Sequence, residues 1–309
     1  SRGLGDVYKR QTFVGREAEL KQLQAAFDGA ISGSSGLVMV VGEPGIGKTS
    51  ICDQLATHVA MRGGRTLHGS CYEEGSLSLP YLPFVEAMHS YVLEREPEAL
   101  RSELGSNAPF VARIVSEVRD RLSIELPAAG DAEDDRWRLL QSVTGFLKNA
   151  STVQPLVIVL EDLHWADRGT LELLTHIARN PQGTRLLLVG TYRDVEVDRN
   201  HPLSGALADL RRITNFTRVT LRGLGAIDVQ KMLANIAGRE VPLALAEQVH
   251  RQTEGNPLFV QEVLRYLVEE GFLQRDGSGK LQRSSSDVSL AMQIPEGLRD
   301  VIGKRLSRL

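Results

Sequence analysis

The chain has 309 residues, 42% of them hydrophobic, which is enough for a sizeable core and about two domains. Its formal net charge of −3 and its pI near 6.2 give no overall basic field of the kind that favours nucleic acid. Two cysteines, Cys52 and Cys71, are too few for a disulfide framework and fit a reducing compartment. No apolar run approaches the roughly 20 residues of a membrane span, and no secretory leader is visible, so we expect a cytoplasmic protein.

We expect neither end of the chain to be part of a complete folded domain. Residues 1–11 are expected to be a non-native or disordered leader, because Asp6–Gln11 resembles the translated end of a sequencing adaptor. An ordinary disordered N-terminus is the alternative. At the other end, the apolar face of a helix begins at Leu298 and stops at Leu309, so we expect the chain to be cut there.

The most informative stretch is residues 42–49, which fit the pattern G-x-x-x-x-G-K-[ST] of a phosphate-binding loop. Its glycines allow the backbone to curl so that several N–H groups point at one anion. Lys48 adds a positive charge for the outer phosphates, and the Thr49 hydroxyl can ligate Mg²⁺. The apolar run Leu37–Val41 before the loop predicts a buried strand, and helical spacing after it places the loop at a helix N-terminus. The sequence therefore predicts nucleotide binding by Gly42, Pro44, Gly45, Ile46, Gly47, Lys48, Thr49 and Ser50.

Further apolar runs at 66–71, 156–160, 185–193 and 216–221 predict four more strands, separated by helical segments. Strands that alternate with helices predict an α/β fold, with a parallel sheet covered by helices on both faces. From Ile227 onward the apolar period is only helical, which predicts a second, all-helical domain that starts near residue 225. A polar loop rich in Ser and Gly is expected at Gly277–Ser289.

Two carboxylates, Glu161 and Asp162, follow the predicted strand at 156–160. In phosphate-loop proteins the metal partner is an acid at the end of a strand beside the loop's own strand. One of these two acids would hold Mg²⁺, directly or through water, and the other would orient the attacking water. The pattern does not separate the two roles, so both are predicted as catalytic and as metal ligands, with Thr49 as a further ligand.

Around these acids the chain resembles a known family. Leu160–Asp167, which reads Leu-Glu-Asp-Leu-His-Trp-Ala-Asp, resembles the second nucleotide motif of the STAND-type AAA+ ATPases. It is most similar to the origin-recognition-like AAA ATPase module of bacterial regulators of the MalT and LuxR kind and of those fused to cyclases or kinases. Many relatives carry Asp at the position of Glu161, and this departure leaves the identity of the catalytic acid open.

Three outer motifs carry the resemblance further, so that it covers residues 12 to 309. Phe13–Glu17 is similar to the family's hhGRE motif, which implies that Val14, Gly15 and Arg16 lie near the adenine. Gly190–Arg193 resembles the first-sensor strand, whose terminal arginine, here Arg193, reads the γ-phosphate. Glu254–Leu258 resembles the GxP element, in which Pro257 would pack against the adenine.

The resemblance also implies a fold and a division into domains. The fold is the AAA+ (ASCE) type of P-loop NTPase, followed by an all-helical lid, with ATP and Mg²⁺ as cofactors. We expect a P-loop ATPase α/β domain at 12–224, a helical lid domain at 225–290 and the start of a truncated winged-helix domain at 291–309.

Several nearby residues have sufficient structural explanations. Trp165 is expected to be a core or hinge anchor, with a ligand contact as the alternative. His164 is expected to be a structural histidine or to touch the phosphate site, and Asp167 to cap a helix. The acidic run Asp131–Asp135 is expected to be a solvated helix start and not a metal site. Arg211 and Arg212 are expected at a solvated helix end, with an arginine finger as the alternative.

The leading functional hypothesis is an ATP-binding and slowly ATP-hydrolysing switch within a larger bacterial signalling or transcriptional regulator. One alternative is a DNA-linked ATPase of the replication-initiator type, and a second is a P-loop phosphotransferase. The expected partners are ATP and ADP and sensor or effector domains beyond the C-terminus, with self-association through the ATPase module as a further candidate. We expect this fragment neither to associate with a membrane nor to contact nucleic acid directly.

Overall fold

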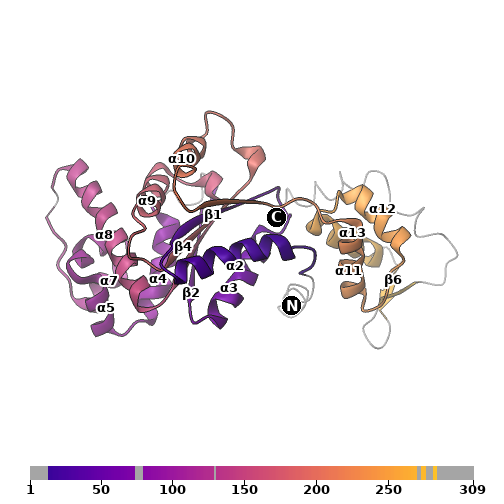
Figure 1. Cartoon of the computed structure of the whole chain (residues 1–309), viewed down its shortest axis with the longest axis horizontal. Coiled ribbons are helices and arrows are strands. Elements are labelled where there is room, and N and C mark those ends of the chain that lie inside the picture. The colour runs from indigo at the N-terminus through magenta and orange to yellow at the C-terminus, as the bar shows by residue number, and fades with distance from the viewer. Residues whose placement is uncertain (1–12, 74–78, 129, 270–272, 276–280, 284–309) are drawn as a thin grey trace. The chain divides into compact units, whose positions relative to one another are not determined.

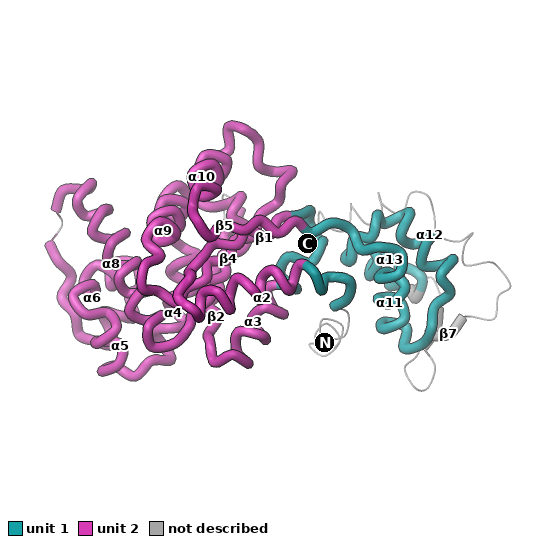
Figure 2. Tube along the Cα trace, in the orientation of Figure 1, with its two compact units in different colours: residues 1–18, 42–51, 221–309 teal, residues 19–41, 52–220 magenta. Residues whose placement is uncertain are grey.

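A computed structural model describes residues 13–73, 79–128, 130–269, 273–275 and 281–283. By their contacts these residues fall into two compact units (Figure 2). Unit 1 comprises residues 1–18, 42–51 and 221–309, and unit 2 comprises residues 19–41 and 52–220.

Unit 2 is built on a five-stranded parallel sheet (Figure 1). Across the sheet the strands run in the order β2-β3-β4-β1-β5, so β4 lies between β1 and β3. Val41 at the end of β1 is level with Tyr192 of β4, and Leu160 near the end of β3 is level with Gly190. The carboxyl ends of β1, β3 and β4 therefore meet at one edge. The strands are β1 (Gly36–Val41), β2 (Arg65–Ser70), β3 (Leu156–Glu161), β4 (Leu186–Tyr192) and β5 (Phe216–Thr220).

The strands form where the chain has continuous apolar runs, because both faces of the sheet are covered. All seven residues of β4 are buried, as are the first five of β3. Side chains alternate between the two faces along a strand, so Leu156, Ile158 and Leu160 join one large core cluster with the helices from α4 to α10. The opposite face is covered by α2 and α3 (Figure 1).

The helices of this α/β region are mostly short. Pro97 opens one of them, where its missing N–H costs nothing, and Asp131 caps another by accepting from the N–H groups of Glu133 and Asp134. The α-helices are α2 (Glu17–Ile31), α3 (Lys48–Met61), α4 (Leu82–Glu94), α5 (Pro97–Leu104), α6 (Ala108–Val111), α7 (Ser116–Leu122), α8 (Ala132–Val153), α9 (Arg168–Arg179) and α10 (Pro202–Leu210). Single 3₁₀ turns occupy η1 (Gly105–Asn107), η2 (Leu163–Trp165) and η3 (Asp194–Glu196).

Unit 1 has a core of its own. Buried residues of three helices form it, among them Val229, Leu233, Val249 and Val263, and the partly buried Val14 packs against them. The helices are α11 (Ala226–Ala237), α12 (Leu243–Thr253) and α13 (Pro257–Glu269). Two short strands, β6 (Leu273–Arg275) and β7 (Leu281–Arg283), pair in antiparallel fashion.

The predicted fold class and all five predicted strands are confirmed within a residue or two. The predicted helical C-terminal portion is confirmed by α11, α12 and α13. The short strands β6 and β7 follow α13, and β7 lies inside the expected polar loop Gly277–Ser289. Both strands read Leu-Gln-Arg, too short a run for a periodicity signal, and the turn-forming residues between them favour a hairpin. The expected leader at 1–11 and the expected winged-helix start at 291–309 lie outside the described residues. None of the described helices combines the length and the apolar character that crossing a membrane requires.

Gly69 offers a direct test of how β2 packs on α4. A Cβ atom at this position would lie 1.8 Å from the carbonyl oxygen of Pro83, a backbone atom that no rotamer change can move away. We expect Gly69→Ala to lower the free energy of unfolding by about 2 kcal/mol or more. The matched control is Gly205→Ala in α10, where a Cβ would meet nothing within 4 Å, and which should raise stability by up to about 1 kcal/mol. Chemical denaturation of both variants measures the difference, and equal stabilities would contradict the packing of β2 on α4.

Candidate functional site

The predicted phosphate loop has the curled backbone that anion binding requires. Gly45 and Gly47 have φ angles of 73° and 103°, a region open to glycine and costly for other residues. A Cβ at Gly47 would meet nothing within 4 Å, so this side of the loop is open. At the start of the loop, a Cβ on Gly42 would lie 2.9 Å from the carbonyl oxygen of Leu221, so only glycine fits there.

Lys48 begins α3 directly after the loop. Its side chain folds back, and the Nζ atom donates to the carbonyl oxygens of Gly42 at 2.9 Å and Glu43 at 3.1 Å. Thr49 and Ser50 follow in the first turn, both exposed. The first N–H groups of a helix have no partner within it and carry partial positive charge, so this end of α3 suits an anion.

Donors from two other segments of unit 1 hold the outer side of the loop. Arg16 is only 6% exposed. Its guanidinium donates to the carbonyl oxygen of Ile46 at 3.2 Å and also to that of Arg222. The side-chain amide of Asn256 donates to the carbonyl of Pro44 at 2.9 Å. The backbone N–H of Leu258 donates to the carbonyl of Gly45 at 3.3 Å. The loop is thus tied to the N-terminal segment and to the start of α13.

The remaining residues predicted near the base also belong to unit 1. Val14 packs against the helical core, and Gly15 has a φ of 66°. The carboxylate of Asp228 lies against Gly15, since a Cβ there would be 2.5 Å from its Cγ. Pro257 is the first residue of α13 and is half-buried.

In unit 2 the predicted acids and the predicted sensor arginine lie at one edge of the sheet. Glu161 is the last residue of β3 and Asp162 follows it, while Arg193 follows β4, the next strand across. β1 lies on the other side of β4, and its last residue, Val41, leads directly into the phosphate loop. The edge at which parallel strands end is where ligands bind in open α/β sheets.

The backbone of Asp162 is fixed in an uncommon conformation. Its φ of 55° is left-handed, a region that few non-glycine residues occupy and that Asp adopts more readily than most. Its N–H donates to the hydroxyl of Thr191 on β4 at 3.0 Å. The position of Asp162 is therefore determined by the neighbouring strand as well as by its own.

Arg193 is held by two neighbours. Its guanidinium pairs with the carboxylate of Glu196 at 2.7 Å and lies over the ring of Trp165, 4.9 Å from the centroid. The buried His164 lies between two acids, with Nε2 at 3.4 Å from Glu196 and Nδ1 at 3.9 Å from Asp162. Trp165 also packs against the core, in keeping with its expected anchoring role.

Asp167 caps α9 as expected, because its carboxylate accepts from the N–H of Thr170 at 3.0 Å. The same carboxylate contributes to a negative potential at this edge. The pKa of the Cys71 thiol is raised to about 12, first by burial and then by Asp167, Asp162 and Glu86. A pKa this high keeps the thiol protonated at neutral pH. The accumulated negative charge is of the sign that a divalent cation would neutralise.

The residues fit ATP and Mg²⁺ by the type of donors they offer. The loop offers an open cradle at Gly47, a lysine and a helix N-terminus to an anion. Among the described residues no three His, Cys, Asp or Glu side chains form a metal site by themselves. Mg²⁺ commonly takes one or two protein oxygens together with phosphates and water. Thr49, Glu161 and Asp162 remain the predicted ligands.

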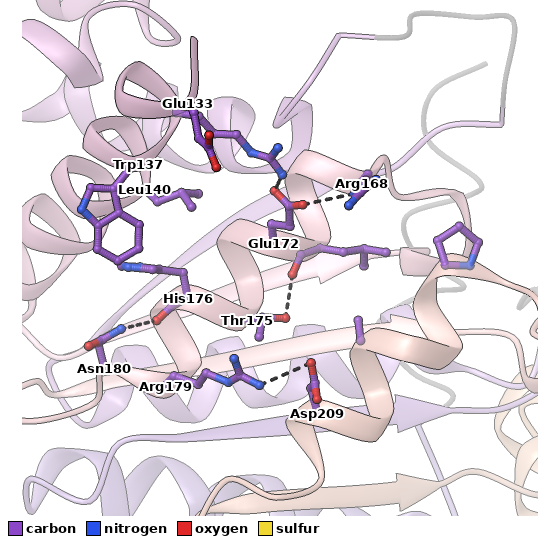
Figure 3. Close-up of a pocket in the computed structure, with 14 residues that line it drawn as sticks. Glu133, Trp137, Leu140, Arg168, Glu172, Thr175, His176, Arg179, Asn180 and Asp209 are labelled. Carbon is purple, nitrogen blue, oxygen red and sulfur yellow. Dashed lines mark hydrogen bonds and ion pairs between the residues drawn. The ribbon is translucent and has the colours of Figure 1, made fainter. Parts of the chain in front are cut away.

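A hollow in the described part of the chain lies elsewhere, among α8, α9 and α10 of unit 2 (Figure 3). Its volume is about 770 Å³, and Trp137 and His176 stand edge to face at its wall. Glu172 pairs there with Arg168 and Arg136, and Arg179 pairs with Asp209. None of the residues predicted to bind nucleotide lines this hollow.

Comparison with known proteins agrees with the fold and the motifs. A family model described as an AAA ATPase domain matches residues 12–189, more than half of the chain. The match includes the phosphate loop, Glu161 and Asp162. A model of a domain of unknown function matches residues 224–273. An uncharacterized protein of Rhizobium meliloti is 25% identical over an alignment of 275 residues, which covers 82% of this chain and 25% of that protein. The chain thus spans about a quarter of this relative's length.

Solved structures are similar in fold at low identity. The Walker-type ATPase of Pyrococcus abyssi has a TM-score of 0.53 at 16% identity, over 97% of this chain and 76% of that one. A STAND protein with a tetratricopeptide repeat sensor from Pyrococcus horikoshii has a TM-score of 0.51 at 14% identity, over 97% and 33% of the two chains. Cdc6p of Pyrobaculum aerophilum has a TM-score of 0.51 at 13% identity, over 86% and 66%.

The sheet order, the glycine loop and the strand-end acids define a P-loop ATPase module of the AAA+ class, with a fold like that of STAND and Cdc6-like proteins. The chain belongs to the AAA ATPase domain family.

Three residues with evident roles at the site were not predicted from the sequence. Asn256 holds the loop, Thr191 holds the backbone of Asp162, and Glu196 pairs with Arg193. Asn256 and Thr191 lie inside motifs that the sequence does mark, but their partners are distant in the chain. Glu196 lies three residues after Arg193 in an exposed turn and carries no sequence signal of its own.

Proposed function

We propose that this chain is the ATP-binding and slowly ATP-hydrolysing switch module of a larger signalling or transcriptional regulator. The observation that carries the proposal is the phosphate loop, with Lys48 at its end and Arg16 and Asn256 holding its outer side. The strand-end acids of β3 and the arginine that ends β4 supply the remaining groups that hydrolysis needs.

The loop residues would bind the phosphates. Backbone N–H groups around Gly45 and Gly47 donate to phosphate oxygens, and Lys48 exchanges the carbonyls of Gly42 and Glu43 for the outer phosphates. The Thr49 hydroxyl would ligate the magnesium, which neutralises phosphate charge when bound. Val14, Gly15, Arg16 and Pro257 would surround the base, with Arg16 acting mainly through the loop carbonyl that it holds.

Glu161 and Asp162 would divide metal binding and water activation between them. In support, the backbone of Asp162 is fixed by Thr191, which gives its short carboxylate a defined origin. Glu161 lies one residue earlier, as the last residue of β3, and carries the longer side chain. Water held between an acid and the γ-phosphorus is positioned for in-line attack.

Arg193 would read the γ-phosphate. In the structure its partner is the carboxylate of Glu196, a weaker anion than a triphosphate. The γ-phosphate would compete for the guanidinium, and hydrolysis would return it to Glu196. A ligand shifts a conformational equilibrium only by its differential affinity for the two states, so loss of the γ-phosphate on hydrolysis would remove the contact that favours the ATP-bound state.

The larger context of the switch is also proposed. The chain spans about a quarter of its Rhizobium meliloti relative and a third of the STAND protein, which carries a tetratricopeptide repeat sensor. Comparable sensor or effector segments would follow this module, and further copies of it would be candidates for self-association.

A DNA-linked ATPase is the second candidate, favoured by the likeness in fold to Cdc6p. The net charge of −3 speaks against it, although residues 271–309 carry an excess of basic over acidic side chains. Binding of duplex DNA that weakens steeply with salt would favour this candidate over the signalling switch.

Lys48→Ala tests nucleotide binding itself. We expect the affinity for Mg-ATP to fall by about tenfold or more, because the outer phosphates lose their cation. The control is Lys21→Ala on the exposed side of α2, which removes the same charge away from the loop. Isothermal titration of both variants gives the affinities, and an unchanged affinity in Lys48→Ala would refute the site.

The strand-end acids are tested one at a time. Glu161→Gln and Asp162→Asn keep the size of each side chain and remove its charge. We expect at least one variant to hydrolyse ATP roughly 100-fold more slowly while it still binds the nucleotide. Released phosphate is measured against Glu98→Gln, an exposed acid of α5. If both variants hydrolyse ATP at the parent rate, the acids are structural.

A further inference from the structure

Three consecutive carbonyl groups of the phosphate loop are held by donors from outside the loop. Asn256 Nδ2 holds the oxygen of Pro44 at 2.9 Å, the N–H of Leu258 holds that of Gly45 at 3.3 Å, and Arg16 holds that of Ile46 at 3.2 Å. These bonds do not form the regular backbone hydrogen-bond pattern of a helix or a strand. Their effect is to fix the direction in which each peptide group faces.

Because the peptide group is planar, the direction of a carbonyl group determines the direction of the N–H group of the next residue. In a trans peptide the C=O of one residue and the N–H of the next point in opposite directions, and no described peptide bond is cis. A carbonyl of Pro44 that is held outward therefore turns the N–H of Gly45 inward. In the same way the held carbonyl of Ile46 turns the N–H of Gly47 inward. The intervening N–H of Ile46 donates to the carbonyl of Glu43 at 3.3 Å, inside the loop itself.

Asn256 is well suited to this task because both ends of its amide are committed. It is 4% exposed, its Nδ2 faces a carbonyl, and its Oδ1 accepts from the N–H of Leu258 at 3.1 Å. A carbonyl can only accept and an N–H can only donate, so the orientation of the amide is fixed by its partners. A Cβ at Gly45 would lie 3.1 Å from the same Oδ1 and 2.6 Å from the Cβ of Leu258, so the start of α13 is pressed against the loop.

We propose that Asn256 is a positioning residue for phosphate binding, which acts by holding the Pro44 carbonyl so that the Gly45 amide faces the nucleotide's phosphates. Arg16 does the same for the Gly47 amide through Ile46. This inference rests on the proposed nucleotide-binding function and adds a specific residue to it. It also makes the phosphate grip depend on α13, because a shift of this helix would release the Pro44 carbonyl.

Two substitutions separate this role from the helix-capping role of the same side chain. Asn256→Asp retains the acceptor for the Leu258 N–H, removes the donor and places a negative oxygen against the Pro44 carbonyl. Asn256→Ala removes the donor and the acceptor and adds no charge. A loss that both variants share is therefore due to the missing donor, and neither the added charge nor the lost cap explains it. The matched controls are Asn235→Asp and Asn235→Ala, at an exposed asparagine of α11.

The test follows individual amides in full-length protein labelled with ¹⁵N-glycine. Inorganic pyrophosphate added to the parent should shift the Gly45 and Gly47 resonances. In both Asn256 variants the Gly45 shift should be lost, while Gly47 should still respond because Arg16 still holds Ile46. The affinity for Mg-ATP should fall about tenfold or more in both, and both Asn235 controls should match the parent.

The outcomes distinguish this inference from the function on which it rests. If Gly45 still shifts in both variants and Mg-ATP affinity stays within about twofold of the parent, Asn256 does not position the loop. That result can occur while Lys48→Ala still abolishes binding, in which case only the positioning role is overturned. If pyrophosphate shifts neither glycine in the parent, nucleotide binding by this loop fails as well. Thermal melting without nucleotide confirms that each variant is folded when it is titrated.

Discussion

The constraint on which the site depends is that a phosphate loop must turn its N–H groups toward an anion, and so must place its carbonyl groups elsewhere. A short loop cannot satisfy these carbonyls by itself, and a polar group left without a partner in a buried position costs about 1–3 kcal/mol. In this protein the donors come from Arg16, Asn256 and Leu258, which lie far from the loop in sequence. Hydrogen bonds therefore join the loop to the N-terminal segment and to the start of α13, which accords with their grouping in unit 1.

The strand order of the sheet brings the other predicted site residues to one edge. Because β4 lies between β1 and β3, three parallel strands end side by side. One end leads into the phosphate loop, the second carries Glu161 and Asp162, and the third carries Arg193. The bond from Asp162 N–H to Thr191, the pairing of Arg193 with Glu196 and the buried His164 show that this edge is highly organised. The pKa of Cys71 is raised first by burial and then by the nearby acids, whose negative charge a bound cation would offset.

Much of the fold could be predicted from the sequence because burial on both faces imposes continuous apolar runs, as at 37–41 and 156–160. The glycine pattern likewise predicted the loop, since positive φ angles at Gly45 and Gly47 leave few other residues possible. The contact of Asn256 with Pro44 could not be predicted, because it joins residues 212 apart through a single side-chain amide. The hairpin of β6 and β7 was missed because three-residue strands carry no measurable period. Local sequence patterns predict local structure, whereas the side chains that orient the predicted site residues reach them only through the tertiary fold.

The central claim is that the loop grips a triphosphate whose magnesium is shared with the acids that end β3. It is tested most directly by a crystal structure with a non-hydrolysable ATP analogue and Mn²⁺ in place of Mg²⁺, in which anomalous scattering locates the metal. The account predicts the metal between the outer phosphates and Thr49 Oγ1, with a carboxylate of Glu161 or Asp162 bound to it directly at about 2 Å or through one water at about 4–5 Å. Phosphates bound away from Gly45 and Gly47, or both carboxylates more than about 10 Å from the metal, would contradict it.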